Sequence, residues 1–156
     1  MHIGKSQGFT LVELMFVILI FGLTMLVSIP GFGRFLQTWK LNGEVDTMAS
    51  TMRTARSAAI MRNTDAVFQF DVNQQTYFYY EDLDRNGSRD KGEYRSATHT
   101  LSPGVIFRGH TLKSTSITFG PRGNASEDGD ITLQNGLNRT RRINLFGGTG
   151  NISVDT

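Results

Sequence analysis

The feature that most constrains this chain is an apolar run near its N-terminus, Phe9–Ile29, which reads FTLVELMFVILIFGLTMLVSI. The run is made mostly of large apolar residues, and its single charged side chain is that of Glu13. As a helix it would be about 31 Å long, which is enough to cross the hydrocarbon core of a bilayer. The sequence therefore predicts one membrane-spanning helix over residues 9–29.

Two other interpretations of this run fit the residues less well. A secretory signal peptide also begins with a short basic stretch, as residues 1–8 do with Lys5, but its apolar core is shorter and a small-residue cleavage site follows it. A buried core helix is apolar on one face, whereas this run is apolar all round.

Glu13 is the exceptional residue of the run, because a carboxylate inside a membrane span is costly and usually has a partner close by. The run contains no basic residue that could be this partner. We therefore expect the partner of Glu13 to come from a chain terminus or from another subunit.

The segment GFTLVEL, from Gly8 to Leu14, resembles the processing site of the type IV pilin and pseudopilin superfamily. The resemblance covers residues 1 to about 35. It implies that a prepilin peptidase removes a leader, residues 1–8, by cutting between Gly8 and Phe9 on the cytoplasmic side, and that the new Phe9 amine is N-methylated. Glu13 would then be the fifth mature residue, which in this family pairs with the N-terminal amine of a neighbouring subunit. Pro30 falls where many members of the family also carry proline.

The resemblance also implies a cellular route and a set of partners. The precursor is expected in the bacterial inner membrane as a single-pass protein, surrounded by lipid, with its head outside the cytoplasm in the periplasm. After processing, an inner-membrane assembly platform would move it into a pilus or a pseudopilus among other pilins or pseudopilins. The N-terminal motif does not separate these two kinds of filament.

A second helical segment is expected over residues 30–63. Pro30 and the glycines beside it should break or bend the helix before this segment. An apolar stripe follows at helical spacing, formed by Leu41, Val45, Met48, Met52, Ala55 and Ala59. Three arginines lie off the stripe, and they could form a solvated back or contact a neighbouring subunit or an anionic ligand: Arg53, Arg56 and Arg62.

From residue 64 to residue 156 the pattern changes to short β-like runs separated by turn residues. The fold class is therefore α+β, a long N-terminal helix packed on an antiparallel β-sheet head. The expected strands are Ala66–Asp71, Gln75–Glu81, Tyr94–Thr98, Gly104–Arg108, Ser116–Gly120, Asp130–Gln134, Arg141–Phe146 and Asn151–Val154.

The later strands resemble the GspH/FimT family, which contains minor pilins and the H-type minor pseudopilin of type II secretion. The segments that carry this resemblance are Ser116–Asn124, Ile131–Leu133 and Arg141–Leu145.

The segment Asp82–Glu93 fits the calcium-loop pattern D-x-[DN]-x-[DN]-G-x5-E. Calcium takes six to eight oxygen ligands, and a backbone carbonyl commonly supplies one of them. The flanking residues read as strands, and three basic residues inside the loop would weaken its attraction for a cation, so a polar hairpin turn is the alternative. The candidate ligands are Asp82, Asp84, Asn86, Asp90 and Glu93 through their side chains and Ser88 through its carbonyl.

A basic cluster near the C-terminus, Arg139, Arg141 and Arg142, could neutralise DNA phosphates. In the FimT branch, DNA uptake is associated with a C-terminal Gly-Arg-x-Arg pattern, and the corresponding segment here, Gly150–Ser153, lacks both arginines. Strand alternation would also place Arg141 and Arg142 on opposite faces. The alternative is solvated charge on a turn and an edge strand, which discourages aggregation.

No catalytic pattern is present in the sequence, so we expect neither an enzyme nor a required cofactor, with Ca²⁺ the one candidate ion. The absence of cysteine excludes a disulfide framework and a thiolate site, and the three histidines have no metal-ligand spacing. A net charge of +2 does not by itself indicate nucleic acid. The sequence favours a minor subunit of a type IV pilus. The alternatives are a minor pseudopilin of type II secretion, a DNA-binding minor pilin for DNA uptake, and an ordinary single-pass protein with a coincidental motif.

Overall fold

The structure is a computed structural model that describes residues 8–155, without the side chains of residues 27–31. It begins with one long helix, α1 (Leu11–Arg62). Of the expected break or bend at Pro30, the break is wrong, because α1 continues through this position. A proline removes one backbone hydrogen bond of the helix, and the bonds on either side can carry the helix past it. Most of the predicted leader, residues 1–7, lies outside the described residues.

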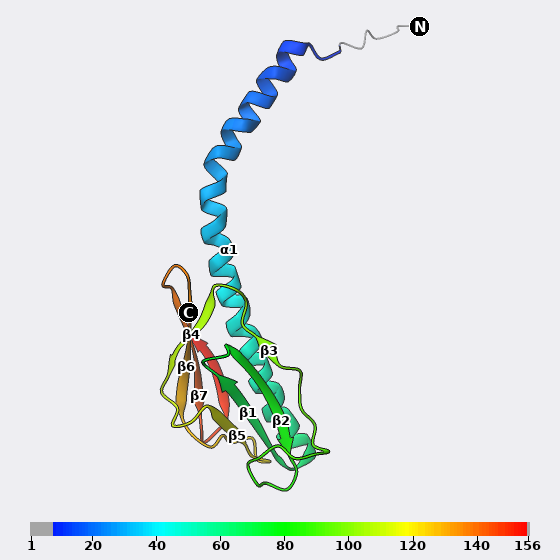
Figure 1. The fold of residues 1–156 in the computed structure, drawn as a ribbon, viewed down its shortest axis with the longest axis vertical. Coiled ribbons are helices and arrows are strands. Elements are labelled where there is room, and N and C mark those ends of the chain that lie inside the picture. Colours follow the sequence, from blue (N-terminus) through cyan, green and yellow to red (C-terminus); the bar gives the residue numbers. More distant parts are fainter. Residues whose placement is uncertain (1–7, 156) are drawn as a thin grey trace, which may run out of the picture. The chain divides into compact units, whose positions relative to one another are not determined.

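The chain divides into two compact units, with the boundary between Leu36 and Gln37. The first unit contains the N-terminal part of α1. The second unit, called the head below, contains the rest of α1 and all the strands, which are coloured from green to red in Figure 1.

The head contains two four-stranded antiparallel sheets (Figure 1). The first has the strand order β3-β2-β1-β5 and the second the order β4-β6-β7-β8. The strands are β1 (Asp65–Asp71), β2 (Thr76–Asp82), β3 (His99–Thr100), β4 (Val105–His110), β5 (Ser116–Phe119), β6 (Gly129–Asn135), β7 (Thr140–Phe146) and β8 (Asn151–Asp155).

Seven of the eight expected strands are confirmed to within two residues at either end. The expected strand Tyr94–Thr98 is wrong, because regular pairing there is confined to His99–Thr100. In its place Arg95 makes an isolated bridge to Tyr80 and stacks its guanidinium 3.9 Å from the centre of the Phe78 ring. Two backbone hydrogen bonds to β2, from the Glu81 N–H to the Tyr94 carbonyl and from the Ser96 N–H to the Tyr79 carbonyl, both 2.9 Å, hold this segment without a continuous ladder.

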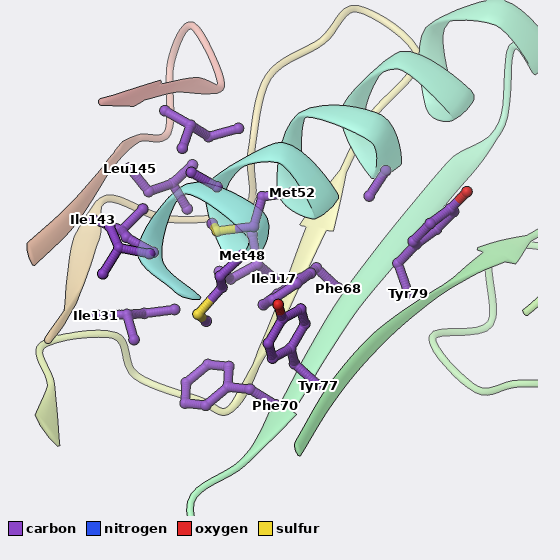
Figure 2. Packing of buried hydrophobic residues seen from close by; sticks show 14 of the residues in the cluster. Met48, Met52, Phe68, Phe70, Tyr77, Tyr79, Ile117, Ile131, Ile143 and Leu145 are labelled. Carbon is purple, nitrogen blue, oxygen red and sulfur yellow. The ribbon is translucent and has the colours of Figure 1, made fainter. Parts of the chain in front are cut away.

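The apolar stripe of α1 forms the centre of the head's core. All six stripe residues, from Leu41 to Ala59, are buried. Figure 2 shows Met48 and Met52 between two groups of side chains, one from each sheet. The first group is Phe68, Phe70, Tyr77 and Ile117, and the second is Ile131, Ile143 and Leu145. Because both sheets bury their apolar faces on the same helix, the head has one shared core.

The three arginines beside the stripe bind other parts of the head, two of them to backbone carbonyls and one to a carboxylate. Arg53 Nη2 donates to the Ile152 carbonyl in β8 at 2.9 Å. Arg56 donates to the Gly123 and Thr149 carbonyls, at 2.7 Å from Nε and 2.9 Å from Nη2. Arg62 forms an ion pair of 3.0 Å with the buried Glu81. Arg53 and Arg62 are still exposed, as expected of a solvated back, while all three arginines also tie α1 to the rest of the head.

A glycine is required at position 150, beside the contacts that Arg56 makes with the Gly123 and Thr149 carbonyls. Its φ of +60° lies in the left-handed region, and a Cβ on this residue would lie 1.9 Å from the Gly123 carbonyl oxygen. Glycine therefore fixes the approach of the turn before β8 to the turn that contains Gly123.

Candidate processing, assembly and metal sites

The predicted cleavage site lies just before α1. Gly8, Phe9 and Thr10 are non-helical and exposed, and Phe9 is 78% exposed. An extended, exposed backbone can enter a peptidase active site without unfolding of a helix. The structure thus places the predicted scissile bond, between Gly8 and Phe9, in a segment that is accessible to cleavage.

Thr10 and Glu13 form the N-terminal cap of α1. The Glu13 N–H donates to Thr10 Oγ1 at 3.3 Å, and the Leu14 N–H donates to the Thr10 carbonyl at 3.2 Å. The pattern Thr-x-x-Glu is that of a capping box, in which residue three of the helix is acidic. This role was not predicted above, although the spacing of the two residues in the sequence would have revealed it.

Glu13 lies in the first turn of α1, where the helix dipole favours a negative charge. Its side chain is exposed, and none of the ion pairs within the described residues includes it. The carboxylate therefore remains accessible to a cation from outside the described chain.

The apolar residues of the first unit are uncovered. Every described position from Gly8 to Leu26 is exposed, including Leu11 at 77% and Leu26 at 71%. Within the part of the chain that the structure describes, no helix has both the length and the hydropathy of a membrane span. Exposed apolar side chains around a whole helix need a covering, which a single copy of the described chain does not supply.

The acidic loop between β2 and β3 brings three of its six candidate ligands together. Oxygen atoms of Asp82, Asp84 and Glu93 lie within 4.8 Å of one another. Asp82 is buried and accepts the N–H groups of Asn86, at 3.1 Å, and Gly87, at 2.8 Å. Burial raises the pKa of the Asp82 carboxyl above its ordinary value, while these N–H groups act in the opposite direction.

The other candidate ligands are engaged within the loop. Asn86 Nδ2 donates to Asp84, at 2.8 Å, and to Asp90, at 2.6 Å. The Ser88 N–H donates to Asn86 Oδ1 at 2.7 Å. An amide nitrogen directed at two carboxylates offers the positive end of its dipole, so Asn86 would have to turn its oxygen inward to bind a cation. Three carboxylates can hold a hard cation such as Ca²⁺, and the rest of its shell would come from amide and carbonyl oxygens.

The basic cluster does not form one surface. Arg141 Nε donates to Asn42 Oδ1 of α1 at 3.0 Å, whereas Arg142 Nε lies 3.6 Å from Asp130 Oδ2 on the outer face of the sheet. The expected alternation of Arg141 and Arg142 is confirmed. Arg139 lies beside Arg141, with Nη1 3.4 Å from Thr38 Oγ1. A DNA site formed by all three arginines is therefore not assembled here.

A buried carboxylate that the sequence interpretation did not single out joins α1 to β3 and to the residues that follow it. Glu44 Oε2 lies 2.9 Å from His99 Nε2, and Glu44 Oε1 accepts the Ser102 N–H at 3.1 Å and the Ser102 hydroxyl. The His99 ring lies 4.8 Å from the buried Tyr77 ring. The signal was the position of Glu44, three residues after Leu41 and four before Met48, which places a charge on the apolar stripe.

Two family models match the sequence. The model described as type II transport protein GspH matches residues 44–149, and the prokaryotic N-terminal methylation motif matches residues 3–29. No curated protein sequence matches the chain.

The fold is similar to solved structures of two minor subunits. The minor pseudopilin EpsH from the type 2 secretion system of Vibrio cholerae has a TM-score of 0.60 and 10% identity, over 75% of this chain and 97% of EpsH. The type IV minor pilin FimU of Pseudomonas aeruginosa has a TM-score of 0.61 and 11% identity, over 78% of this chain and 92% of FimU. At these identities the likeness shows the pilin-like α+β fold alone, as expected from the sequence.

The methylation motif and the GspH match bear out the resemblances of both ends of the chain. They exclude a coincidental motif in an unrelated single-pass protein, and the GspH match favours the type II secretion alternative over the type IV pilus. Pseudopilins are structural proteins that are processed by a prepilin peptidase and assemble with one another, so the protein is not an enzyme. The chain belongs to the GspH family of type II transport proteins.

Proposed function

We propose that this protein is a minor pseudopilin of a type II protein secretion system. The observation that carries the proposal is the GspH family match over residues 44–149, which covers most of the head. It is joined to a methylation motif and an exposed cleavage segment at Gly8 and Phe9.

In the proposed route, the apolar run Phe9–Ile29 holds the precursor in the inner membrane, with the head in the periplasm. Cleavage then frees the Phe9 amine, which is methylated. The uncovered apolar helix leaves the bilayer through the assembly platform and packs against the N-terminal helices of other pseudopilins, which supply the covering that a single chain lacks.

Glu13 is proposed to pair with the N-terminal amine of a neighbouring subunit. Its carboxylate is exposed and has no cationic partner among the described residues. In the filament interior an unpaired carboxylate would be costly, so the pair favours the register in which the two charges meet. The capping bond uses the Glu13 N–H and leaves the carboxylate available for this pairing.

Deletion of the gene, with surface pili and secreted protein measured in the same cultures, tests the kind of filament. We expect secretion to be lost and pili to remain. Complementation with Gly8→Val should restore neither secretion nor the mass of a processed, methylated Phe9 terminus, because a branched side chain obstructs the scissile bond. Gly43→Ala, at an exposed glycine in the part of α1 within the head with open space around it, should restore both. Loss of pili with normal secretion would reassign the protein to a type IV pilus.

A further inference from the structure

A polar groove lies between the first turns of α1 within the head and the turn that joins β6 to β7. Its volume is about 480 Å³, and apart from the buried Leu41 its lining is polar: Thr38, Asn42, Asn138, Arg139, Thr140 and Arg141. It is large enough for a small charged group and too small for a folded partner.

The walls of the groove are held in place by a buried amide, that of Asn135. Its Oδ1 accepts the N–H groups of Leu137 and Arg139, each at 3.0 Å, and its Nδ2 donates to the Gln37 carbonyl at 3.3 Å. The turn is thereby fixed to the helix, so Arg139 and Arg141 are presented from rigid backbone. A site that is ordered before binding loses less conformational entropy when a ligand arrives.

The two guanidinium groups of the groove have only uncharged partners. Arg141 donates to the Asn42 side-chain oxygen and to the Asp155 carbonyl, both at 3.0 Å. Arg139 makes one long contact, to Thr38. Among the described residues no carboxylate lies within 4.0 Å of either guanidinium, whereas Arg62 and Arg142 each have one. The groove therefore holds two positive charges without a bound anion from the described chain.

The chemistry of this lining suits a phosphate group. A guanidinium presents parallel N–H donors that match two phosphate oxygens, and two such groups can bind one phosphate from two sides. The amide of Asn42 and the hydroxyl of Thr140 add uncharged donors at the same groove.

The place of the groove in the chain favours the phosphate of a lipid. The last residue of the first unit is Leu36, and Thr38 lies two positions after it. Asn42 lies about 9 Å beyond Leu36 along the helix. Trp39, the only tryptophan of the chain, lies between them and is 65% exposed. Tryptophan side chains prefer the interface between a membrane and water.

We propose that this groove binds the phosphate of an anionic phospholipid headgroup while the precursor is in the membrane. This inference rests on the proposed function, since it needs the first unit to be in the bilayer. The bound headgroup holds the head against the membrane surface, and this contact is released when the subunit enters the filament.

The test uses the head alone, residues 37–156, because this unit is compact and has its own core. Vesicles of phosphatidylglycerol and phosphatidylethanolamine are titrated at low ionic strength, with sedimentation and the emission of Trp39 as readouts. We expect binding and a blue shift of the emission. The pair Arg139→Gln and Arg141→Gln should weaken binding by about tenfold or more, and lysine at both positions should restore part of it.

The matched control is the pair Arg108→Gln and Arg122→Gln, which removes the same charge from exposed positions of the head outside this groove. It should weaken binding by less than about threefold. Equal losses in the two pairs, or no vesicle binding, would overturn the proposal. Titrations with inorganic phosphate and with a single-stranded oligonucleotide show whether the groove prefers a free phosphate or a nucleic-acid phosphate to that of a lipid. Binding of either one without binding to vesicles would also overturn the proposal. Processing and secretion are not measured here, so such a failure leaves the proposed function intact.

Discussion

Arg56 of α1 donates a hydrogen bond of 2.7 Å to the carbonyl of Gly123, a residue 67 positions further along the chain. The same guanidinium donates to the Thr149 carbonyl, beside the turn that leads into β8. One side chain of the helix thus joins two turns from different parts of the head. This arrangement makes Arg56 a sensitive point for the stability of the head.

Replacement of Arg56 by Met should destabilise the head by about 2 kcal/mol, because the buried Gly123 loses the charged donor to its carbonyl and the exposed Thr149 carbonyl loses a second one. Urea unfolding of residues 37–156 measures this change. Arg122→Met, a change of the same chemistry at an exposed position, should have an effect below about 0.5 kcal/mol. Equal effects of the two variants would show that the contacts of Arg56 contribute nothing specific.

Glu44→Ala should cost about 2–3 kcal/mol, because the Ser102 N–H and His99 would lose a buried charged acceptor. Glu44→Gln should cost less, since its remaining oxygen can still accept from one of them. Asp46→Asn, which removes an exposed acid two residues away, is the control. Hydrogen exchange at Ser102 would report local opening, and unchanged protection in Glu44→Ala would contradict this role.

Tyr79 should make the head less stable at alkaline pH. Burial raises the pKa of its hydroxyl to about 12, with smaller contributions from its hydrogen bond to Tyr94 and from the charge of Glu81. Between pH 10 and about 12 the unfolded chain loses this proton and the folded chain keeps it, so stability falls as pH rises through that window. Below pH 10 both states are protonated and the full stability remains.

Tyr79→Phe should therefore reduce the loss of stability between pH 8 and pH 11 by up to about 1.4 kcal/mol. The pKa values of Tyr77 and Tyr80 are also raised by burial, so part of the alkaline loss should persist. Thermal unfolding at the two pH values checks this. The same alkaline loss in wild type and variant would remove Tyr79 as its source.

The loop Asp82–Glu93 remains a predicted calcium site, and the approach of Asp82, Asp84 and Glu93 makes it testable. Millimolar Ca²⁺ should raise the melting temperature of the head, because a ligand that binds only the folded state stabilises it. Asp84→Asn should abolish the shift, and Asp46→Asn should leave it unchanged. If Ca²⁺ changes neither melting temperature nor heat of mixing, the loop is a polar turn and nothing more.

Glu13 has two roles that mutation can separate, since its N–H takes part in the helix cap and its carboxylate is free of the cap. Glu13→Gln should leave cleavage after Gly8 unchanged and impair assembly, whereas Thr10→Ala should weaken the cap by about 1 kcal/mol and leave assembly near normal. Crosslinking of mature subunits in membranes compares the two. Normal assembly of Glu13→Gln would remove the proposed charge pair.

The sequence patterns predicted the features that depend on short-range periodicity, namely the buried face of the helix and the positions of most strands. The stripe from Leu41 to Ala59 is buried as its spacing indicates, and alternation located the strands from β4 to β8. Periodicity failed at Tyr94–Thr98, where an isolated bridge and the contact of Arg95 with the Phe78 ring take the place of a continuous ladder. A pattern of local residues carries no information about such contacts.

Sequence patterns also could not predict the contacts between residues that are far apart in the chain. Arg53 and Arg56 look like solvated charges on the back of an amphipathic helix, and only the closure of the head brings carbonyls of β8 and its preceding turn to them. In the acidic loop the motif predicted six ligands, and the structure gathers three carboxylates. The remaining candidates depend on the orientation of an amide and a carbonyl, which residue types do not specify.

The shared core has a consequence for the order in which the head is made. The helix that fills this core is translated before any strand, and β8, which receives Arg53 of that helix from 99 residues away, is translated last. The core cluster, which includes Met48, Met52 and Ile152 of β8, can therefore be completed only when β8 has emerged. A nascent chain that stops before β8 presents an unfinished core, and quality-control proteases would distinguish it from a complete subunit by that open side.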